Sequence, residues 1–308
     1  KIIAVYDDIA DYILVKQGGK INAVGTPDKP IVMTSEKEEP GAWGGIHICG
    51  RAHTNAEGGK GSSEIGGAVY GGNDDADNSG TLQYIRLEYT GFAFDEEHEA
   101  NGISFYGVGN GTIVDHCQAY KGSDDGFEFF GGSVNVSNLV AVSCSDDSFD
   151  WTEGWNGKGT NLVAYQEAES TLGYDCDCLM ECDNNGSNNA ATPVAHPVLK
   201  NLILVGNGGS KQGIRLRAGT EVEIDNAKVC GKGQPLTVET ALTENALKNG
   251  TSKLTNITLT SELSCKEGIY THADFIAVTS NKVDANLSYS SFEDIKKECS
   301  WMNGSWVK

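Results

Sequence analysis

Basic residues are scarce in this sequence: 23 lysines and arginines stand against 43 aspartates and glutamates, which gives a formal net charge of −20. Nucleic acids and anionic membrane surfaces bind proteins through basic patches. We therefore expect no nucleic-acid partner. An excess of carboxylates is typical of a soluble exported protein, or of one that binds cations.

Long apolar runs are missing as well. The sequence contains neither an 18-residue apolar stretch nor a secretory h-region, so we expect no direct insertion of this chain into a membrane. It begins at Lys1 without an initiator methionine and runs at once into the strand-like "YILVKQGGKI". We interpret it as a processed or trimmed piece, so a missing signal peptide says little about the precursor.

Proline is rare, with six residues, whereas glycine is abundant, with 39, and one pair of turn-containing segments is nearly repeated. "SDDGFEFFGG" (123–132) and "SDDSFDWTEG" (145–154) match at an interval of 22 residues. A second motif, Asn or Asp followed by alternating apolar residues, recurs at 23-residue intervals at Asp115, Asn138 and Asn161. Short alternating strands between small polar corners, repeated at this period, predict an all-β fold, a parallel β-helix.

This fold predicts which side chains stack. Equivalent residues of successive coils lie about 4.8 Å apart. Phe127 is then expected to stack on Phe149, and Phe129 on Trp151, inside the coil. The residues between them point outward, and the apolar–X–apolar pattern extends this outward column to His47, Ser104, Glu128, Asp150, Glu181 and Arg215.

The chain divides near residue 233. Residues 1–233 are predicted to form the β-helix, and residues 234–308 the final coils and a C-terminal cap. The segment "LTVETALTENALKNG" has helical spacing that stops at Asn249-Gly250, so the cap is expected to contain short helices. Such a cap covers strand edges that an open β-helix exposes.

The paired acids allow three interpretations, since like charges directly opposite each other on neighbouring strands are destabilising. Their side chains could cap backbone N–H groups in a turn. They could instead bind Ca²⁺, which takes clustered oxygen ligands, with Asp124 and Asp146 as metal ligands. They could also act in catalysis as acid and base with separated pKa values, with Asp125, Asp146 and Asp147 as the candidates.

A second calcium candidate is "DADNSG", in which Asp75, Asp77 and Ser79 have the spacing of the opening of a calcium loop. The twelfth position is Arg86 instead of glutamate, so the segment is no EF-hand. The alternative is an acidic turn before the strand "TLQYIRLEY".

A ligand surface is predicted along the outward column. Arg215 and Arg217 share its face, either as ion pairs along the ladder or as a guanidinium fork for the carboxylate of an acidic sugar. An aromatic side chain nearby, Trp155, is a candidate stacking platform for a sugar. The predicted ligand-binding set is Glu128, Asp150, Glu181, Arg215, Arg217 and Trp155.

Nine cysteines are many for a cytosolic protein, and no CxxC pair indicates zinc. The tightest cluster is "CDCLMEC", with Cys176, Cys178 and Cys182. We expect partial disulfide pairing in an oxidising compartment.

Several segments, in order, resemble a large group of uncharacterised exported β-helix proteins of Gram-negative bacteria, many of them lipoproteins and numerous in Bacteroidetes. The similarity covers roughly residues 10–220 and includes "GGKINAVGTPDKPIVMTS", "WGGIHICGRAHTN", "YGGNDDADNSGTLQYIRLEYTG" and both acidic segments. The resemblance implies a right-handed parallel β-helix of the pectin-lyase-like superfold, located outside the cell or on the outer-membrane surface.

A second resemblance is to polygalacturonase-type glycoside hydrolases. "SDDGFEF" and "SDDSFDW" are similar to their two aspartate coils and "GIRLRAG" to their basic strand, which implies catalytic roles for Asp125, Asp146, Asp147 and Arg215. This sequence departs from the pattern because "WNGKGTNLV" stands where those enzymes have Gly-His-Gly, and Arg217 stands where they have lysine. A pectate-lyase mechanism would instead use Ca²⁺ between aspartates and an arginine base.

We therefore expect an exported or cell-surface β-helix protein that is stabilised by Ca²⁺ and binds a polysaccharide or another surface component along its acidic face. The alternatives are a polysaccharide hydrolase or lyase on the same face, and a structural adhesion or spacer module.

Overall fold

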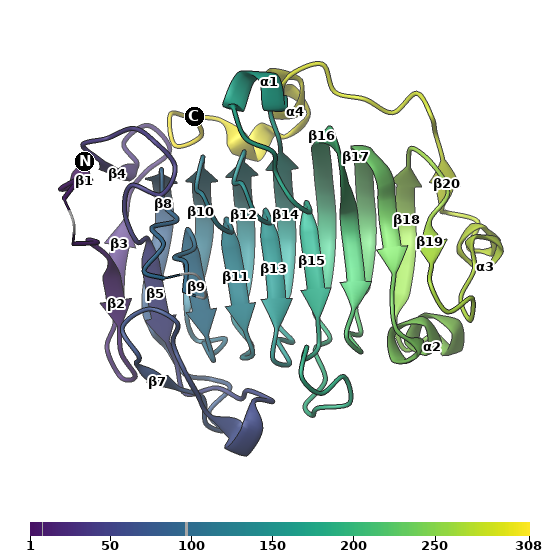
Figure 1. The fold of residues 1–308 in the computed structure, drawn as a ribbon, viewed down its shortest axis with the longest axis horizontal. Helices are drawn as coiled ribbons and strands as arrows, with labels where there is room; N and C mark the ends of the chain where they lie inside the picture. The colour runs from purple at the N-terminus through teal and green to yellow at the C-terminus, as the bar shows by residue number, and fades with distance from the viewer. Residues whose placement is uncertain (8, 96–97) are drawn as a thin grey trace.

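The computed structural model describes residues 1–7, 9–95 and 98–308, and its strands follow one another along a single long axis (Figure 1). Nearly all strand pairs are parallel, and each strand pairs with its equivalents in the preceding and following coils. The fold is a right-handed parallel β-helix, as the sequence predicted.

One side of the coils, sheet 1, is a ladder of short parallel strands. Its members are β2 (Ile13–Val15), β5 (Ile46–Cys49), β9 (Ile103–Tyr106), β11 (Phe127–Phe130), β13 (Phe149–Thr152), β15 (Met180–Asp183), the ends of β16 (Val198–Arg217) and β17 (Glu223–Val238), and β19 (Ser264–Cys265).

The opposite side, sheet 2, has longer strands. It comprises β1 (Ile2–Ala4), β3 (Ile21–Val24), β4 (Ile31–Ser35), β8 (Gly80–Glu88), β10 (Ile113–Tyr120), β12 (Asn135–Val142), β14 (Lys158–Tyr165), the first parts of β16 and β17, β18 (Lys253–Leu259) and β20 (Lys282–Val283). Because β16 and β17 run round the bend, they belong to both sheets.

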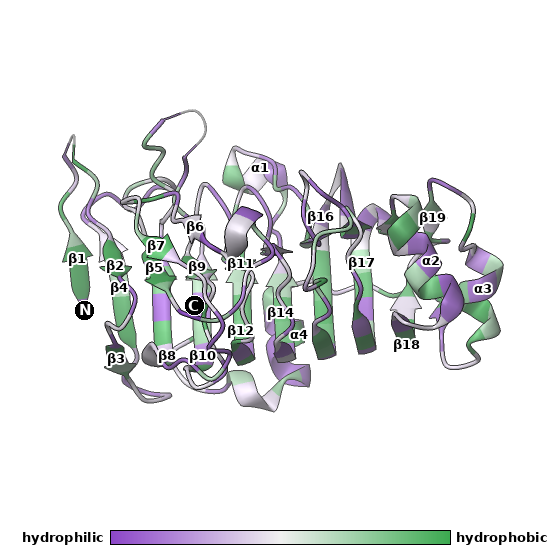
Figure 2. Ribbon diagram, turned by 90° about the horizontal axis from the view of Figure 1, so that it is seen from below, coloured by the Kyte–Doolittle hydropathy of each residue, from purple (hydrophilic) through white to green (hydrophobic). Residues whose placement is uncertain are grey.

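The core lies between the two sheets. Apolar residues concentrate in the strands, and polar residues in many of the turns between them (Figure 2). Phe127 and Phe149 are register partners whose rings stack at 5.6 Å between centroids, which confirms that prediction. Phe129 and Trp151 are also register partners in the core, but the rings that stack on Phe129 are those of Phe105 (5.0 Å) and Trp155 (4.1 Å).

Each long strand of sheet 2 bends at one residue in the left-handed backbone region. The bend position has a φ between 52° and 63° in seven coils and is occupied by Tyr84, His116, Asn138, Asn161, Asn201, Asn226 and Asn256. The predicted equivalence of Asp115 with Asn138 is therefore wrong by one residue, since Asp115 is the register partner of Ser137. Asparagine suits the bend because it tolerates this conformation and its amide N–H donates to the asparagine of the preceding coil, as from Asn161 Nδ2 to Asn138 Oδ1 (2.7 Å).

Two segments leave the regular path of the coils. Residues 50–79 carry η1 (Glu57–Gly59) and the antiparallel hairpin β6 (Gly61–Ser62) and β7 (Val69–Tyr70), and they cover part of the outer face of sheet 1. The helix α1 (Glu169–Leu172) interrupts the coil between β14 and β15.

The C-terminal region has the predicted short helices, α2 (Ala241–Asn249), α3 (His272–Ala277), α4 (Phe292–Glu298) and η2 (Ser300–Met302). Strand β17 crosses the predicted boundary at residue 233 and stays paired up to Val238. After α3 the chain runs back along the outside of sheet 2, so that the C-terminus lies near the N-terminal coils (Figure 1). Ser305 donates its backbone N–H to Pro27, and Lys308 donates its own to Gln118 Oε1 (each 2.8 Å).

The described residues include no helix with both the length and the apolar composition needed to traverse a lipid bilayer.

Candidate functional site: an acidic groove on sheet 1

The outer face of sheet 1 carries the predicted column of side chains in unbroken register. His47 pairs with Ser104, Ser104 with Glu128, and the series continues through Asp150, Glu181 and Arg215. These residues share one face because side chains of a strand alternate, and their neighbours on both sides point into the core. The column forms the first row of the site.

Two further rows come from the turns that precede the strands. The register of β11 with β13 makes Asp124 equivalent to Asp146 and Asp125 equivalent to Asp147. The register of β13 with β15 adds Asp177 to the row of Asp124 and Asp146. The repeated Ser-Asp-Asp turn thus places acids beside acids in three rows, with one coil spacing between neighbours.

Asp125 and Asp147 hold the turns together. The Asp125 Oδ1 atom accepts the backbone N–H of Asp147 at 2.8 Å, and Asp147 Oδ1 accepts that of Cys178 at 2.7 Å. Asp125 is 6% exposed and Asp147 5% exposed. The turn-capping interpretation is therefore correct for these two residues, although each keeps a second carboxylate oxygen for other partners.

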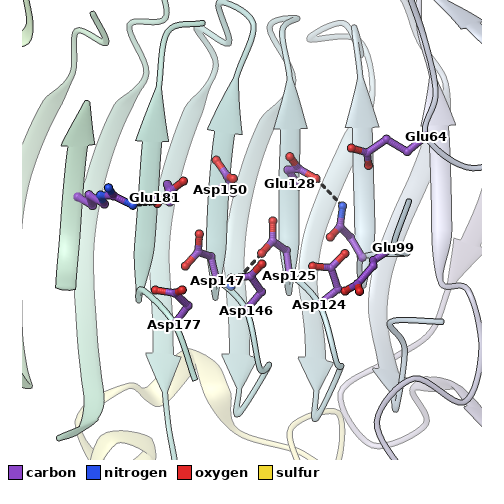
Figure 3. A pocket seen from close by; sticks show the side chains of 12 residues that line it. Glu64, Glu99, Asp124, Asp125, Glu128, Asp146, Asp147, Asp150, Asp177 and Glu181 are labelled. Atoms are coloured by element: carbon purple, nitrogen blue, oxygen red, sulfur yellow. Dashed lines mark hydrogen bonds and ion pairs between the residues drawn. The ribbon is translucent and has the colours of Figure 1, made fainter. Parts of the chain in front are cut away.

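The three rows form the floor of a groove of about 430 Å³. Figure 3 shows Glu128, Asp150 and Glu181 in one line and the turn aspartates in a second band below it, while Glu64 and Glu99 approach from one end. The lining consists of Glu64, Glu99, Asn101, Asp124, Asp125, Glu128, Asp146, Asp147, Asp150, Asp177, Glu181 and Arg215.

Among the described residues, the ion pairs of the groove lie toward its C-terminal end, where Lys211 contacts Asp177 and two arginines are engaged. Arg215 pairs with Glu181 (Nη1 to Oε2, 2.9 Å) and with Glu239 (3.2 Å). Arg217 pairs with Asp183 (2.7 Å) and also contacts Glu181. The ion pairs along the ladder, one of the two predicted roles of the arginines, are thus present.

The central carboxylates have no such neutralisation. Within residues 1–7, 9–95 and 98–308, no lysine or arginine forms an ion pair with Asp124, Asp125, Glu128, Asp146 or Asp150. Burial, followed by the charge of Asp146, raises the pKa of Asp124 to about 7. Burial, followed by the charge of Asp177, raises the pKa of Asp146 to about 6. Without a cation, some of these carboxyl groups keep their protons near neutral pH, which lowers the negative charge of the groove.

Groups of acid oxygens lie within reach of a single ion. One set is Asp124, Asp125 and Asp146, a second is Asp125, Glu128 and Asp150, and each set offers three ligand atoms within 4.8 Å of one another. Ca²⁺–oxygen distances are about 2.3–2.6 Å, so two oxygens on opposite sides of one ion lie about 5 Å apart. The predicted metal ligands Asp124 and Asp146 are therefore brought together, and Asp125 joins them.

A family model described as a pectate-lyase like beta helix domain matches residues 1–308. The chain belongs to this family. No curated protein and no solved structure matches the chain. Membership in the pectate-lyase like β-helix family confirms the superfold that both resemblances implied.

Other predicted residues of this β-helix protein lie away from the groove. The Asp75 carboxylate accepts the backbone N–H and the ring Nδ1 of His53 (3.1 and 2.7 Å), and Asp77 Oδ2 accepts the backbone N–H of Arg51 (3.1 Å). Ser79 Oγ lies 3.4 Å from Asp77 Oδ2. These carboxylates hold the loop against its neighbours, and calcium binding at this loop remains a prediction.

The prediction of Trp155 as a ligand platform is wrong. Its side chain is 1% exposed and lies in the core between Phe129 and Trp151. Its indole N–H donates to the Val134 carbonyl (3.2 Å), so both the ring and its polar atom are used within the protein.

The expected disulfides are absent, because all nine cysteines lie in the described residues and all are free thiols. Cys182 in β15 faces the core, whereas Cys178 lies in the preceding turn, with its sulfur 3.7 Å from Gln212 Oε1. The turn position of Cys178 and the strand position of Cys182 thus place the two thiols in different surroundings.

Four residues that line the groove were not predicted from the sequence: Glu64, Glu99, Asn101 and Asp177. Asp177 was detectable once "CLMECDN" had been aligned with the acidic repeats, because it precedes its strand as Asp146 does. Glu64 lies in the long excursion between β5 and β8, where no repeat constrains its position.

Proposed function

We propose that this protein binds a polysaccharide along the acidic groove, and that Ca²⁺ held by Asp124, Asp125 and Asp146 supplies the contact. The observation that carries the proposal is the convergence of these three carboxylates within the reach of one ion. Ca²⁺ takes six to eight oxygen ligands, so a site with three carboxylates leaves positions for the hydroxyl or carboxylate oxygens of a sugar.

Two features support a polysaccharide as the ligand. The groove volume of about 430 Å³ falls in the range of ligand pockets, and the groove runs across successive coils, so that a linear chain can follow it. The family description, pectate-lyase like, points to the same class of ligand.

The proposal includes a location outside the cell or on the outer-membrane surface. Extracellular calcium modules function with dissociation constants of about 10⁻⁴–10⁻³ M, which suits a site that leaves several positions to water and ligand. The net charge of −20 suits a soluble exported protein.

The test is binding of a panel of neutral and uronic acid polysaccharides, measured by affinity electrophoresis with Ca²⁺ and with EDTA. Retardation by at least one polysaccharide in Ca²⁺, abolished by EDTA and by Asp124→Asn/Asp146→Asn, is the expected result. Equal retardation in EDTA would exclude a role for the ion, and no retardation by any polysaccharide would remove the proposed ligand class.

A second candidate function, cleavage of the bound polysaccharide, is favoured by the raised pKa values of Asp124 and Asp146. Carboxyl groups with pKa values of about 7 and about 6 can donate or accept a proton near neutral pH. Release of reducing ends, or of unsaturated products absorbing in the ultraviolet, would distinguish an enzyme from a binding protein.

A further inference from the structure

We propose that the groove holds a second divalent cation, bound by Asp125, Glu128 and Asp150, and that Asp125 is shared between the two ions. This inference rests on the proposed function, which places the first ion at Asp124, Asp125 and Asp146. The shared residue makes the two ions one binuclear centre instead of two separate sites.

The geometry of the rows explains the sharing. Asp125 lies in the middle row, between Asp124 in the outer turn row and Glu128 in the strand row. Its carboxylate contributes to both sets of clustered oxygens. A carboxylate has two oxygens and several lone pairs, so it can bridge two ions while Oδ1 continues to accept the Asp147 N–H.

An independent observation comes from Asn101, which lines the groove and is only 1% exposed. Its Nδ2 donates to Ser104 Oγ (3.0 Å) and to Glu128 Oε2, which places the amide beside the second set of ligands. Its Oδ1 is buried and has no hydrogen-bond partner among the described residues.

Asp150 presents the same deficit, because its buried Oδ1 also lacks a partner in the described part of the chain. A buried polar atom left without a partner destabilises the folded protein. Asn101 Oδ1 and Asp150 Oδ1 both lie beside the second set of carboxylates. A cation bound there would give both oxygens a partner, because Ca²⁺ binds carbonyl and carboxylate oxygens alike.

The charge balance also favours more than one ion. The two sets together contain five carboxylates, Asp124, Asp125, Glu128, Asp146 and Asp150. One divalent ion leaves three negative charges in the groove, whereas two leave one. The nearest arginines do not make up the difference, since Arg215 and Arg217 are engaged by Glu181, Asp183 and Glu239.

The experiment counts bound ions in the whole chain by calcium titration calorimetry and by native mass spectrometry after removal of metal. The wild type is expected to bind two ions in the groove. Glu128→Gln keeps a side-chain oxygen next to Asn101 but removes the charge, and is expected to bind one. Asp146→Asn, at the first site, is also expected to bind one, and Asp125→Asn to weaken both.

Glu57→Gln, an exposed carboxylate outside the groove, serves as the matched control and should bind as many ions as the wild type. Circular dichroism and thermal unfolding establish that each variant is folded, and Asp150→Asn replaces Glu128→Gln if the latter is not. Two ions in the wild type and one in the second-site variant support the inference.

One ion in the wild type, unchanged by Glu128→Gln and by Asp150→Asn, would overturn the second site and leave the first intact. No ion at all would overturn the proposed function as well. The two failures are therefore distinguishable.

Discussion

Asp125 and Asp147 occupy the same position in successive coils, and the carboxylate of the first accepts the backbone N–H of the second at 2.8 Å. The carboxylate of Asp147 repeats this contact with Cys178 in the next coil, at 2.7 Å. One oxygen of each carboxylate therefore stabilises the turn of the next coil by a hydrogen bond. The carboxyl group also lines the groove, where it contributes to the acidity. These two roles can be separated by mutation.

Asp125→Ala and Asp125→Asn are expected to have opposite effects on the metal-free protein. Alanine removes the acceptor and leaves the buried Asp147 N–H unpaired, which lowers the free energy of unfolding by about 1–3 kcal/mol. Asparagine keeps an oxygen acceptor and removes a charge that is repelled by Asp124 and Glu128, so its free energy of unfolding in EDTA should exceed that of the wild type. Urea denaturation in EDTA measures both. Equal losses in the two variants would show that the charge has no destabilising role.

The metal-free protein is expected to lose stability as the pH rises from about 4.5 to 7.5. The pKa values of Asp124 and Asp146 rise from 3.8 to about 7 and about 6 in the folded protein, so the folded state binds more protons than the unfolded state across this window. The stabilising contribution of these protons is complete below pH 3.8 and is lost as the pH passes through about 6 and 7. Burial also raises the pKa of Asp125, Glu128 and Asp150, which has the same sign.

Urea denaturation at several pH values in EDTA tests this dependence, with Asp124→Asn/Asp146→Asn as the control that should flatten it. Ca²⁺ should reverse the trend, because the ion displaces the same protons. At a hundredfold excess over the dissociation constant, each ion that binds only the folded state adds about 2.7 kcal/mol. A metal-free protein whose stability increases steadily between pH 4.5 and 7.5 would contradict the assignment of protonated carboxyls to the groove.

The sequence predicted the repeating part of the molecule well, for a physical reason. Glu128 and Asp150 lie 22 residues apart in segments that match residue by residue, and a parallel β-helix converts such a match directly into contact. The same logic extended the outward column to Arg215 although the intervals there are unequal, since the apolar–X–apolar pattern itself identifies the outward residue.

Residues outside the repeat could not be placed in this way. Trp155 follows the end of β13, so alternation does not apply, and its ring turns back into the core against Phe129. Glu64 reaches the groove from a loop that no period relates to the strands, whereas Asn101 occupies the position of Asp125 one coil earlier, where the repeat has an amide instead of a carboxylate. The return of the C-terminal segment along sheet 2 joins Ser305 to Pro27, a contact between residues far apart in sequence that carries no local signal.

The asparagine ladder predicts a difference between two small substitutions at Asn161. This residue has a φ of 60°, donates to Asn138 Oδ1 (2.7 Å) and accepts from Asn201 Nδ2 (3.0 Å). Asn161→Ala loses both hydrogen bonds, each worth about 0.5–1.5 kcal/mol, and adds the left-handed strain of an alanine. Asn161→Gly loses the same bonds without that strain, so it should be more stable than the alanine variant by up to about 1 kcal/mol. Chemical denaturation of both variants measures the difference, and an alanine variant as stable as the glycine one would mean that backbone strain is unimportant at the bend.

The returning C-terminal segment should stabilise the coils without taking part in the groove. Trp306 is fully buried on the outside of sheet 2 and packs edge-on against His116, with 5.2 Å between ring centroids. Trp306→Ala is expected to lower the free energy of unfolding by about 3–5 kcal/mol, as for other large aromatic residues removed from a core. Lys297→Ala, an exposed change in the same segment, should alter it by less than about 0.5 kcal/mol.

Because sheet 2 lies across the core from the groove, the Trp306 variant should bind as much Ca²⁺ as the wild type at a temperature where it is folded. Loss of Ca²⁺ binding by folded Trp306→Ala, measured by calorimetry at low temperature, would show instead that the outer layer of sheet 2 and the acidic groove are coupled through the core.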